Sequence, residues 1–246
     1  MTLPLPLRNR LADLILDSLH DGDARQGLEA LAGVCADPHA LAGRDRPAAF
    51  PADLFEARGG GLVVKSGWRE YASELGERAA RAWRMLGARP LDPPDAPLRV
   101  ALGAAADLFD AGLYFEMHDA LEPYWMRAGG IDREALQGLI QTAVGFQHLA
   151  NGNLGGASAL LHDGCAKLLG RRLEGLDLEP FAREVERCLD HVLTLGPEAA
   201  VRFDWTSVPR FPRHGTPHPS PLPREEREPR IPLPHRGRGQ GKGTEG

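Results

Sequence analysis

The sequence lacks the patterns that mark disulfide-stabilised, zinc-binding and membrane-spanning proteins. It has only three cysteines, Cys35, Cys165 and Cys188, and these lie far apart with no CxxC spacing. That distribution argues against a disulfide framework and against a zinc knuckle. The chain starts without an apolar run of signal-peptide length, and no stretch of 18 apolar residues occurs anywhere in it. We therefore expect a soluble protein of the cytoplasm with no membrane partner.

Negative charge is concentrated in the body of the chain. The 246 residues carry a formal net charge of −5, from 29 Lys and Arg against 34 Asp and Glu. Eight of the basic and four of the acidic residues follow Thr206, so a tail of +4 follows a body of −9. An acidic body is poorly suited to neutralise phosphates, so nucleic acid is not an expected partner.

Proline-rich segments divide the chain into four predicted parts. Residues 1–89 form a helical N-terminal region whose role the sequence does not indicate. Residues 90–97 contain four prolines, which cannot continue a helix, and are predicted to be a linker. Residues 98–197 are predicted to be an all-α domain. Residues 198–246 are rich in Pro, Arg and Gly and are predicted to be a disordered tail.

Apolar residues recur with helical spacing in residues 1–89 and again in residues 98–197, so the predicted fold class is all-α. One short β element is expected near residues 61–65, where Leu-Val-Val follows three glycines, and a short helix near residues 52–57. The longer predicted helices cover residues 7–19, 24–35, 67–86, 98–110, 113–127, 132–150, 154–173 and 179–195.

The centre of the predicted domain is free of charged residues. No Asp, Glu, Lys or Arg occurs from Ala135 to His162, although amide and imidazole side chains are frequent there. Such a segment is typical of the buried centre of a helical bundle that holds a polar network. The amides and imidazoles also make it too polar for a membrane span.

Two glycines, Gly112 and Gly152, each separate a predicted helix from the next. Each is expected to adopt the left-handed conformation that ends a helix, which gives helix-turn-helix corners like those of tetratricopeptide repeats. The glycines are 40 residues apart, whereas the tetratricopeptide period is 34 residues. We therefore predict a helical bundle instead of a superhelical array. Small residues at 155–157 and 159 predict a close helix–helix contact after the second corner.

Polar side chains gather on the helices predicted over residues 113–127 and 132–150, which lie between the two glycines. His118 and Glu122 are four residues apart and share one helix face, with Asp119 beside them, while Glu116 faces elsewhere. On the next helix the polar stripe consists of Gln137, Gln141 and His148.

Three interpretations of these residues remain open. In the first, His118 and Glu122 hydrogen-bond to the stripe on the next helix and fix the helix register, because buried polar groups need partners. In the second, the polar residues of both helices line a pocket for a small molecule, an anion or a protein segment. The candidate ligand-binding residues are Glu116, His118, Asp119, Glu122, Trp125, Gln137, Gln141 and His148.

In the third interpretation a divalent metal ion is the cofactor. His118, Glu122 and His148 supply nitrogen and oxygen ligands of the kind that zinc, iron and manganese accept. Glu116 or Asp119 would then act as the acid–base group of a hydrolase or oxidoreductase. The sequence contains neither HExxH nor the Glu-x-x-His pair of di-iron bundles, so no established metal motif supports this interpretation.

Two motifs in the central region resemble a known family. FDAGLYFEMHDALEPYW (Phe109–Trp125) and LQGLIQTAVGFQHLANGNLGGASALL (Leu136–Leu161) are similar to the two signatures of domain of unknown function 309. The resemblance covers about residues 105–170 and implies a compact all-helical fold. Asp110 and Asp119 stand where the family usually has Asn and Glu. The matching positions are Gly112, Tyr114, Phe115, Glu116, His118, Glu122, Trp125, Gln137, Gly138, Gln141, His148, Gly152, Asn153 and Gly156.

The family has no established activity, so the resemblance supports the fold and leaves function open. From the sequence we expect a helical binding or scaffold module with a buried His, Glu and Gln network, whose partner is a small molecule or a protein segment. The alternative is a metal-dependent enzyme that uses His118, Glu122 and His148.

Overall fold

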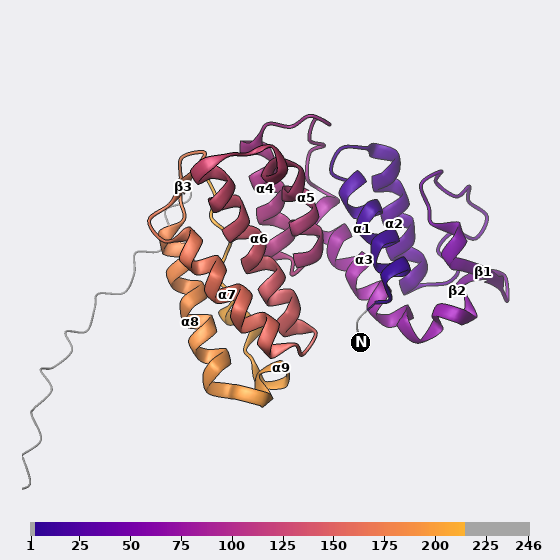
Figure 1. Cartoon of the computed structure of the whole chain (residues 1–246). Helices are drawn as coiled ribbons and strands as arrows, with labels where there is room; N and C mark the ends of the chain where they lie inside the picture. The colour runs from indigo at the N-terminus through magenta and orange to yellow at the C-terminus, as the bar shows by residue number, and fades with distance from the viewer. Residues whose placement is uncertain (1–2, 215–246) are drawn as a thin grey trace, which may run out of the picture.

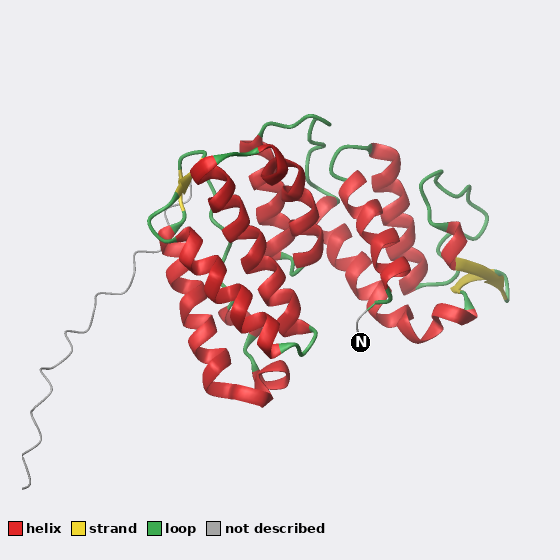
Figure 2. Cartoon of the chain, viewed as in Figure 1, coloured by secondary structure: helices red, strands yellow, loops and turns green. Residues whose placement is uncertain are grey.

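The computed structural model describes residues 3–214, which form two groups of helices lying side by side (Figure 1). The all-α prediction is confirmed, since the strands within residues 3–214 are confined to two small hairpins (Figure 2). The first group contains α1 (Leu5–Asp17), α2 (Gly22–Ala36) and α3 (Ala72–Leu86). The second contains α4 (Leu98–Asp110), α5 (Tyr114–Arg127), α6 (Gly130–Ala150), α7 (Leu154–Leu168), α8 (Glu179–Leu195) and α9 (Ala199–Arg202).

The helices of the first group bury the apolar stripes that the sequence predicts. Leu7 and Ile15 on α1 are fully buried, as are Leu75 and Ala79 on α3. Asp21 caps the start of α2: its side chain accepts a hydrogen bond from the Asp23 N–H at 2.7 Å and so satisfies an otherwise free backbone donor. The helix predicted over 67–86 is shorter than expected, because residues 66–71 form a 3-10 turn before α3.

The expected β element is confirmed as β2 (Gly61–Val64), and its partner β1 (Phe55–Arg58) was not predicted. The two strands pair antiparallel with Phe55 opposite Val64. Gly59 and Gly60 both have positive φ, +58° and +81°, as a tight two-residue hairpin turn requires. The short helix expected near residues 52–57 is limited to a 3-10 turn over Ala52–Leu54.

Both predicted corners are confirmed. Gly112 has φ +69° between α4 and α5, and Gly152 has φ +76° between α6 and α7. The helix predicted over 154–173 ends at Leu168, because a second hairpin follows it, made of β3 (Arg172–Leu173) and β4 (Leu176–Asp177). Further 3-10 turns cover Gly196–Glu198 and Trp205–Ser207.

α6 and α7 approach closely, in part through the small residues expected to allow it. A Cβ on Gly156 would lie 2.7 Å from Nδ1 of His148 on α6, whereas Gly155 has no atom within 4 Å of such a Cβ. The contact continues further along both helices. A Cβ on Gly138 or Gly145 would lie only 2.8 Å from the side chain of Leu168 or Leu161, respectively, so the absence of side chains brings the two backbones together there.

The N-terminal region and the central domain share one hydrophobic core, which runs from Leu3 to Phe211. The proline-rich linker between them is fixed by polar contacts on both sides. Arg89 pairs with Asp92 at 2.7 Å and also with Asp107 on α4. The Asp92 N–H donates to the carbonyl of Leu19 at 2.8 Å.

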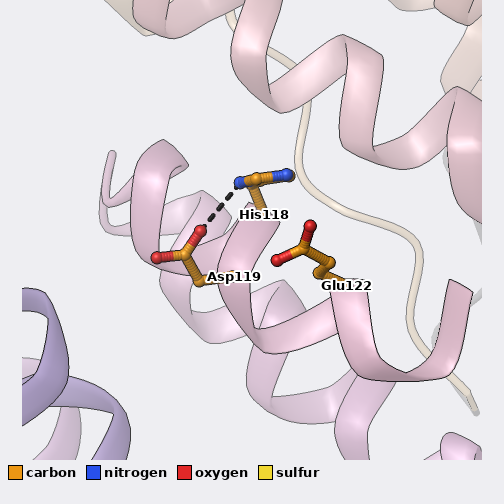
Figure 3. Close-up of side chains that lie close together, drawn as sticks. All are labelled: His118, Asp119 and Glu122. Carbon is orange, nitrogen blue, oxygen red and sulfur yellow. Dashed lines mark ion pairs between the residues drawn. The ribbon is translucent and has the colours of Figure 1, made fainter. Parts of the chain in front are cut away.

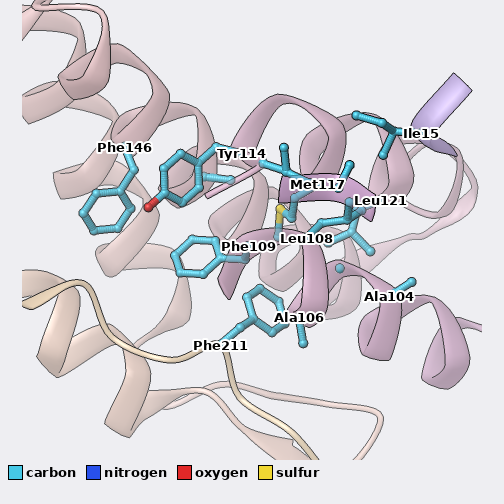
Figure 4. Packing of buried hydrophobic residues seen from close by; sticks show 14 of the residues in the cluster. Ile15, Ala104, Ala106, Leu108, Phe109, Tyr114, Met117, Leu121, Phe146 and Phe211 are labelled. Carbon is cyan, nitrogen blue, oxygen red and sulfur yellow. The ribbon is translucent and has the colours of Figure 1, made fainter. Parts of the chain in front are cut away.

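Residues 198–214, the first part of the predicted disordered tail, are ordered, which corrects that prediction. Phe203 and Phe211 are 4% and 2% exposed, and Phe211 packs against Phe109 with ring centroids 5.6 Å apart (Figure 4). Arg213 makes ion pairs with Asp107 at 2.7 Å and with Asp110 at 2.8 Å. These contacts order the first part of the segment because they bury aromatic surface and neutralise two carboxylates of α4. The rest of the predicted tail, residues 215–246, lies outside the described residues.

None of the helices in residues 3–214 is long and apolar enough to cross a membrane.

Candidate functional site

Three candidate residues on α5 come together on one face of the helix. The Nδ1 of His118 lies 2.8 Å from Oδ1 of Asp119, and Glu122 stands beside the imidazole (Figure 3). One potential ligand atom from each residue lies within 4.8 Å of the other two. All three side chains are partly buried, so they form a small polar cluster that water can reach.

The cluster favours the protonated form of His118. The hydrogen bond with Asp119 is the largest cause that raises the pKa of His118 above its usual value, and partial burial opposes it. The charge of Glu122 raises the pKa further, whereas that of Arg8 on α1 lowers it. Arg8 also stacks on the ring of Phe115 at 4.0 Å. α1 therefore covers part of this face of α5.

The stripe on α6 does not join the α5 cluster. Among residues 3–214, no hydrogen bond links His118 or Glu122 to Gln137, Gln141 or His148. Nδ1 of His148 instead accepts a hydrogen bond at 2.7 Å from Nδ2 of Asn153, across the α6–α7 corner.

The polar stripe on α6 does not reach His118 and Glu122 because the face of α5 that carries these two residues points away from it. Asp119 lines a smaller cavity of about 390 Å³ together with Leu16 of α1 and Pro94 of the linker, so the face turns toward the N-terminal region. The predicted metal set of His118, Glu122 and His148 is thus not assembled, and the observed cluster contains Asp119 in place of His148.

Trp125 packs at the start of α6, apart from that cluster. The guanidinium of Arg133 lies 4.1 Å from the centre of the Trp125 ring, and Arg133 Nη1 donates to the Trp125 carbonyl at 3.0 Å. The indole Nε1 is enclosed and has no hydrogen-bond partner among the described residues. These contacts hold the α5–α6 connection together.

Glu116 faces the opposite way, as the sequence predicts, and is fully buried. Its Oε1 accepts a hydrogen bond from Nη2 of Arg78 at 2.6 Å, and the Arg78 side chain is only 9% exposed. Oε2 of Glu116 and Nε of Arg78 are enclosed without partners among residues 3–214. Glu116, a candidate ligand-binding residue of the first motif, is therefore paired with Arg78 of the N-terminal region.

Arg78 also lines a cavity of about 880 Å³, larger than the one beside Asp119. Five segments line it: α3, both helix-turn-helix corners, α9 through Ala200, and residues 205–210. Gly112 and Gly152 form the two corners, and Arg81 of α3 packs over the first, with its Nη1 3.1 Å from where a Gly112 Cβ would be. Segments that are far apart in sequence thus converge on one space.

The lining combines aromatic surface with polar groups. Phe109, Tyr114 and Trp205 all line the cavity, and the ring centroids of Phe109 and Tyr114 are 5.2 Å apart. Burial raises the pKa of Tyr114 well above its usual value, and the charge of Arg81 opposes that rise. The phenol therefore stays protonated at neutral pH and can donate a hydrogen bond.

Sequence reasoning identified both corners but not the cavity between them. The sequence did contain one indication that Arg78 is buried: Arg78 occupies the same face of α3 as Leu75, Ala79 and Ala82, which are fully buried. A charged residue within an apolar helical stripe requires a buried partner. Trp205 had no such signal, because it lies in the segment predicted to be disordered.

The comparison with protein families bears on the central part of the chain. No curated protein and no solved structure matches the chain. The matching family covers residues 102–160, which leaves out Trp205 and four of the five charged residues that line the cavity: Glu74, Arg78, Arg81 and Arg210. Residues 102–160 match the family described as Domain of unknown function (DUF309), which confirms the resemblance expected from the two motifs.

Proposed function

We propose that this protein is a binding module that holds one small ligand in the cavity between the two corners. One observation carries the proposal: α3, the corners at Gly112 and Gly152, Ala200 of α9 and residues 205–210 line a single space of about 880 Å³. Ligand sites commonly have volumes of about 300–1,000 Å³ and combine apolar walls with a few polar groups. The partner is therefore a small molecule in preference to a protein segment.

Filling the cavity tests this proposal. Ala200 lines the cavity, whereas its neighbour Val201 does not and is 89% exposed. We expect Ala200→Trp to abolish the binding of small aromatic fragments, detected by saturation-transfer NMR, and Val201→Trp to leave it unchanged. The fragment set should contain aromatic acids, amines and alcohols of similar size. Fragments that bind both variants equally well, or no binding to the unmodified protein, would contradict the proposal.

A divalent metal ion on α5 is the second candidate function, favoured by the proximity of His118, Asp119 and Glu122. Asp119 accepts the Nδ1–H of His118, which leaves Nε2 available as a ligand. Metal-bound histidines commonly have such a carboxylate partner on the other ring nitrogen. Glu122 would supply an oxygen ligand, and water would complete the coordination. A metal ion held there would supply the Lewis acid of a hydrolase or the redox centre of an oxidoreductase.

The chain offers a matched control for the metal site. His162 and Asp163 form a similar neighbouring pair at 3.3 Å, but the two side chains are 75% and 55% exposed. In a calorimetric titration with Zn²⁺ or Mn²⁺, His118→Gln should lose binding and His162→Gln should retain it. Equal heats from the two variants would exclude α5 as the site.

We also infer a cytoplasmic location. The three cysteines remain free thiols, and burial raises the pKa of Cys35 and Cys188 to about 11 each, which keeps them protonated and unreactive. Free thiols are typical of a reducing compartment.

A further inference from the structure

We propose that the ligand of the large cavity is a small organic oxyanion, a carboxylate or phosphate monoester attached to a planar apolar body. This inference rests on the proposed function, because it assumes that the cavity binds a ligand, and it adds the chemical class. It follows from the guanidinium groups in the lining and from the aromatic surface beside them.

Arg78 is the first of these groups. Its side chain is 9% exposed, and because it lines the cavity, that small exposed part faces the cavity. Glu116 engages only Nη2, which leaves the guanidinium with further donors and no second carboxylate on Nε. Guanidinium groups bind carboxylate and phosphate oxygens through parallel N–H donors. A buried arginine with unused donors therefore suits an oxyanion.

The other charges in the lining also favour an anion. Arg81 and Arg210 bring the guanidinium groups to three, against the two carboxylates Glu74 and Asp110, but Arg210 is 82% exposed and its Nη1 already lies 3.7 Å from Oδ2 of Asp110. Asp110 is already engaged, because its Oδ1 accepts the Phe211 N–H at 2.9 Å and its Oδ2 accepts Arg213 Nη2 at 2.8 Å. Little of the Asp110 charge is therefore available to hold a cation.

The remaining lining fits the apolar part of such a ligand. Trp205, which is 39% exposed, offers aromatic surface on which a planar group can pack, and the buried ring of Phe109 lies behind this wall of the cavity. Tyr114, whose pKa is raised by burial, remains a neutral O–H donor that can reach an oxygen. A free inorganic anion would leave this aromatic surface unused.

Four probes of similar size but different charge test the inference: benzoate, phenyl phosphate, benzylamine and benzyl alcohol. We expect one or both of the acids to bind at micromolar to millimolar concentration, and the amine and alcohol to bind at least about tenfold more weakly. Arg81→Gln should weaken the acid about tenfold to a hundredfold, as the loss of a charged hydrogen bond predicts. Arg84→Gln, on the exposed side of the same helix, should not change the affinity.

The outcomes separate this inference from the proposed function. Binding of the amine or alcohol as tightly as the acids, abolished by Ala200→Trp, would retain the binding module and overturn the anionic ligand. Acid binding that is the same in Arg81→Gln and in the unmodified protein would also overturn it. If none of the probes binds in a manner sensitive to Ala200→Trp, both proposals fail. Preference for benzoate or for phenyl phosphate identifies the acid group.

Discussion

Glu116→Ala is expected to destabilise the protein strongly, because it leaves a buried guanidinium without its counter-charge. Glu116 on α5 is fully buried, and its Oε1 is 2.6 Å from Nη2 of Arg78 on α3. The pair connects the N-terminal region to the central domain. Both the direction of the effect and its size follow from this geometry.

The magnitude can be bounded in two ways. At an effective dielectric constant of about 20, two unit charges at hydrogen-bond distance attract by about 4–6 kcal/mol. Removal of one partner of a buried ion pair costs about 3–5 kcal/mol. Because Arg78 borders the cavity, water can reach part of its guanidinium, so we expect a loss near the lower limit, about 3 kcal/mol. That is a large share of a typical unfolding free energy of about 5–15 kcal/mol.

The assay is urea unfolding followed by circular dichroism, applied to Glu116→Ala, Glu116→Leu, Arg78→Met and the double variant Arg78→Met/Glu116→Leu. The double variant should recover most of the stability, since an apolar pair leaves no buried charge. Arg171 and Glu134 form a control pair at nearly the same distance, 2.7 Å, but with side chains 37% and 54% exposed. Glu134→Ala should cost about 1 kcal/mol or less. A loss for Glu116→Ala as small as that, or single losses that simply add, would refute the reasoning.

Three further predictions concern the packing, the C-terminal segment and pH. Gly145→Ala should destabilise the protein by about 1–3 kcal/mol, because the new Cβ would lie 2.8 Å from the side chain facing it on α7. As a control, Gly103→Ala should stabilise the protein by about 0.5–1 kcal/mol, because no atom lies within 4 Å of the new Cβ. Equal effects of the two substitutions in thermal unfolding would disprove the close contact. Phe211→Ala should cost about 3–5 kcal/mol in urea, whereas no change would mean that residues 208–213 do not pack on the core. His118 has a raised pKa in the folded state, chiefly through Asp119, so its contribution is complete below the unfolded value of about 6.5 and is lost as pH rises through the folded value. His118→Gln should therefore reduce stability more at about pH 5.5 than at about pH 8.5, and a pH-independent loss would contradict the raised pKa.

The helices and corners were predictable because their signals are local. α4 covers the predicted residues 98–110, and α8 the predicted residues 179–195. Gly112 and Gly152 have the positive φ expected of them, because only a residue without Cβ adopts that conformation at little cost. The β1 strand was missed, since its four residues form a strand only by pairing with β2.

The local arrangement of the polar residues on α5 was predictable, but their neighbours on other helices were not. Helical spacing placed His118, Asp119 and Glu122 on one face, and the structure brings them together. Spacing within one helix does not say which neighbouring helix covers that face. α1 covers it in part, so the stripe on α6 forms its own contacts, such as that between His148 and Asn153.

The sequence by itself determined the helices, their glycine corners and the resemblance of residues 102–160 to a family, because each depends on residues close together in the chain. Only the tertiary structure decided that Arg78 meets Glu116, 38 residues further along, and that residues 205–210 return to close the cavity. These contacts depend on how whole helices pack, and many packings are compatible with the same local periodicity.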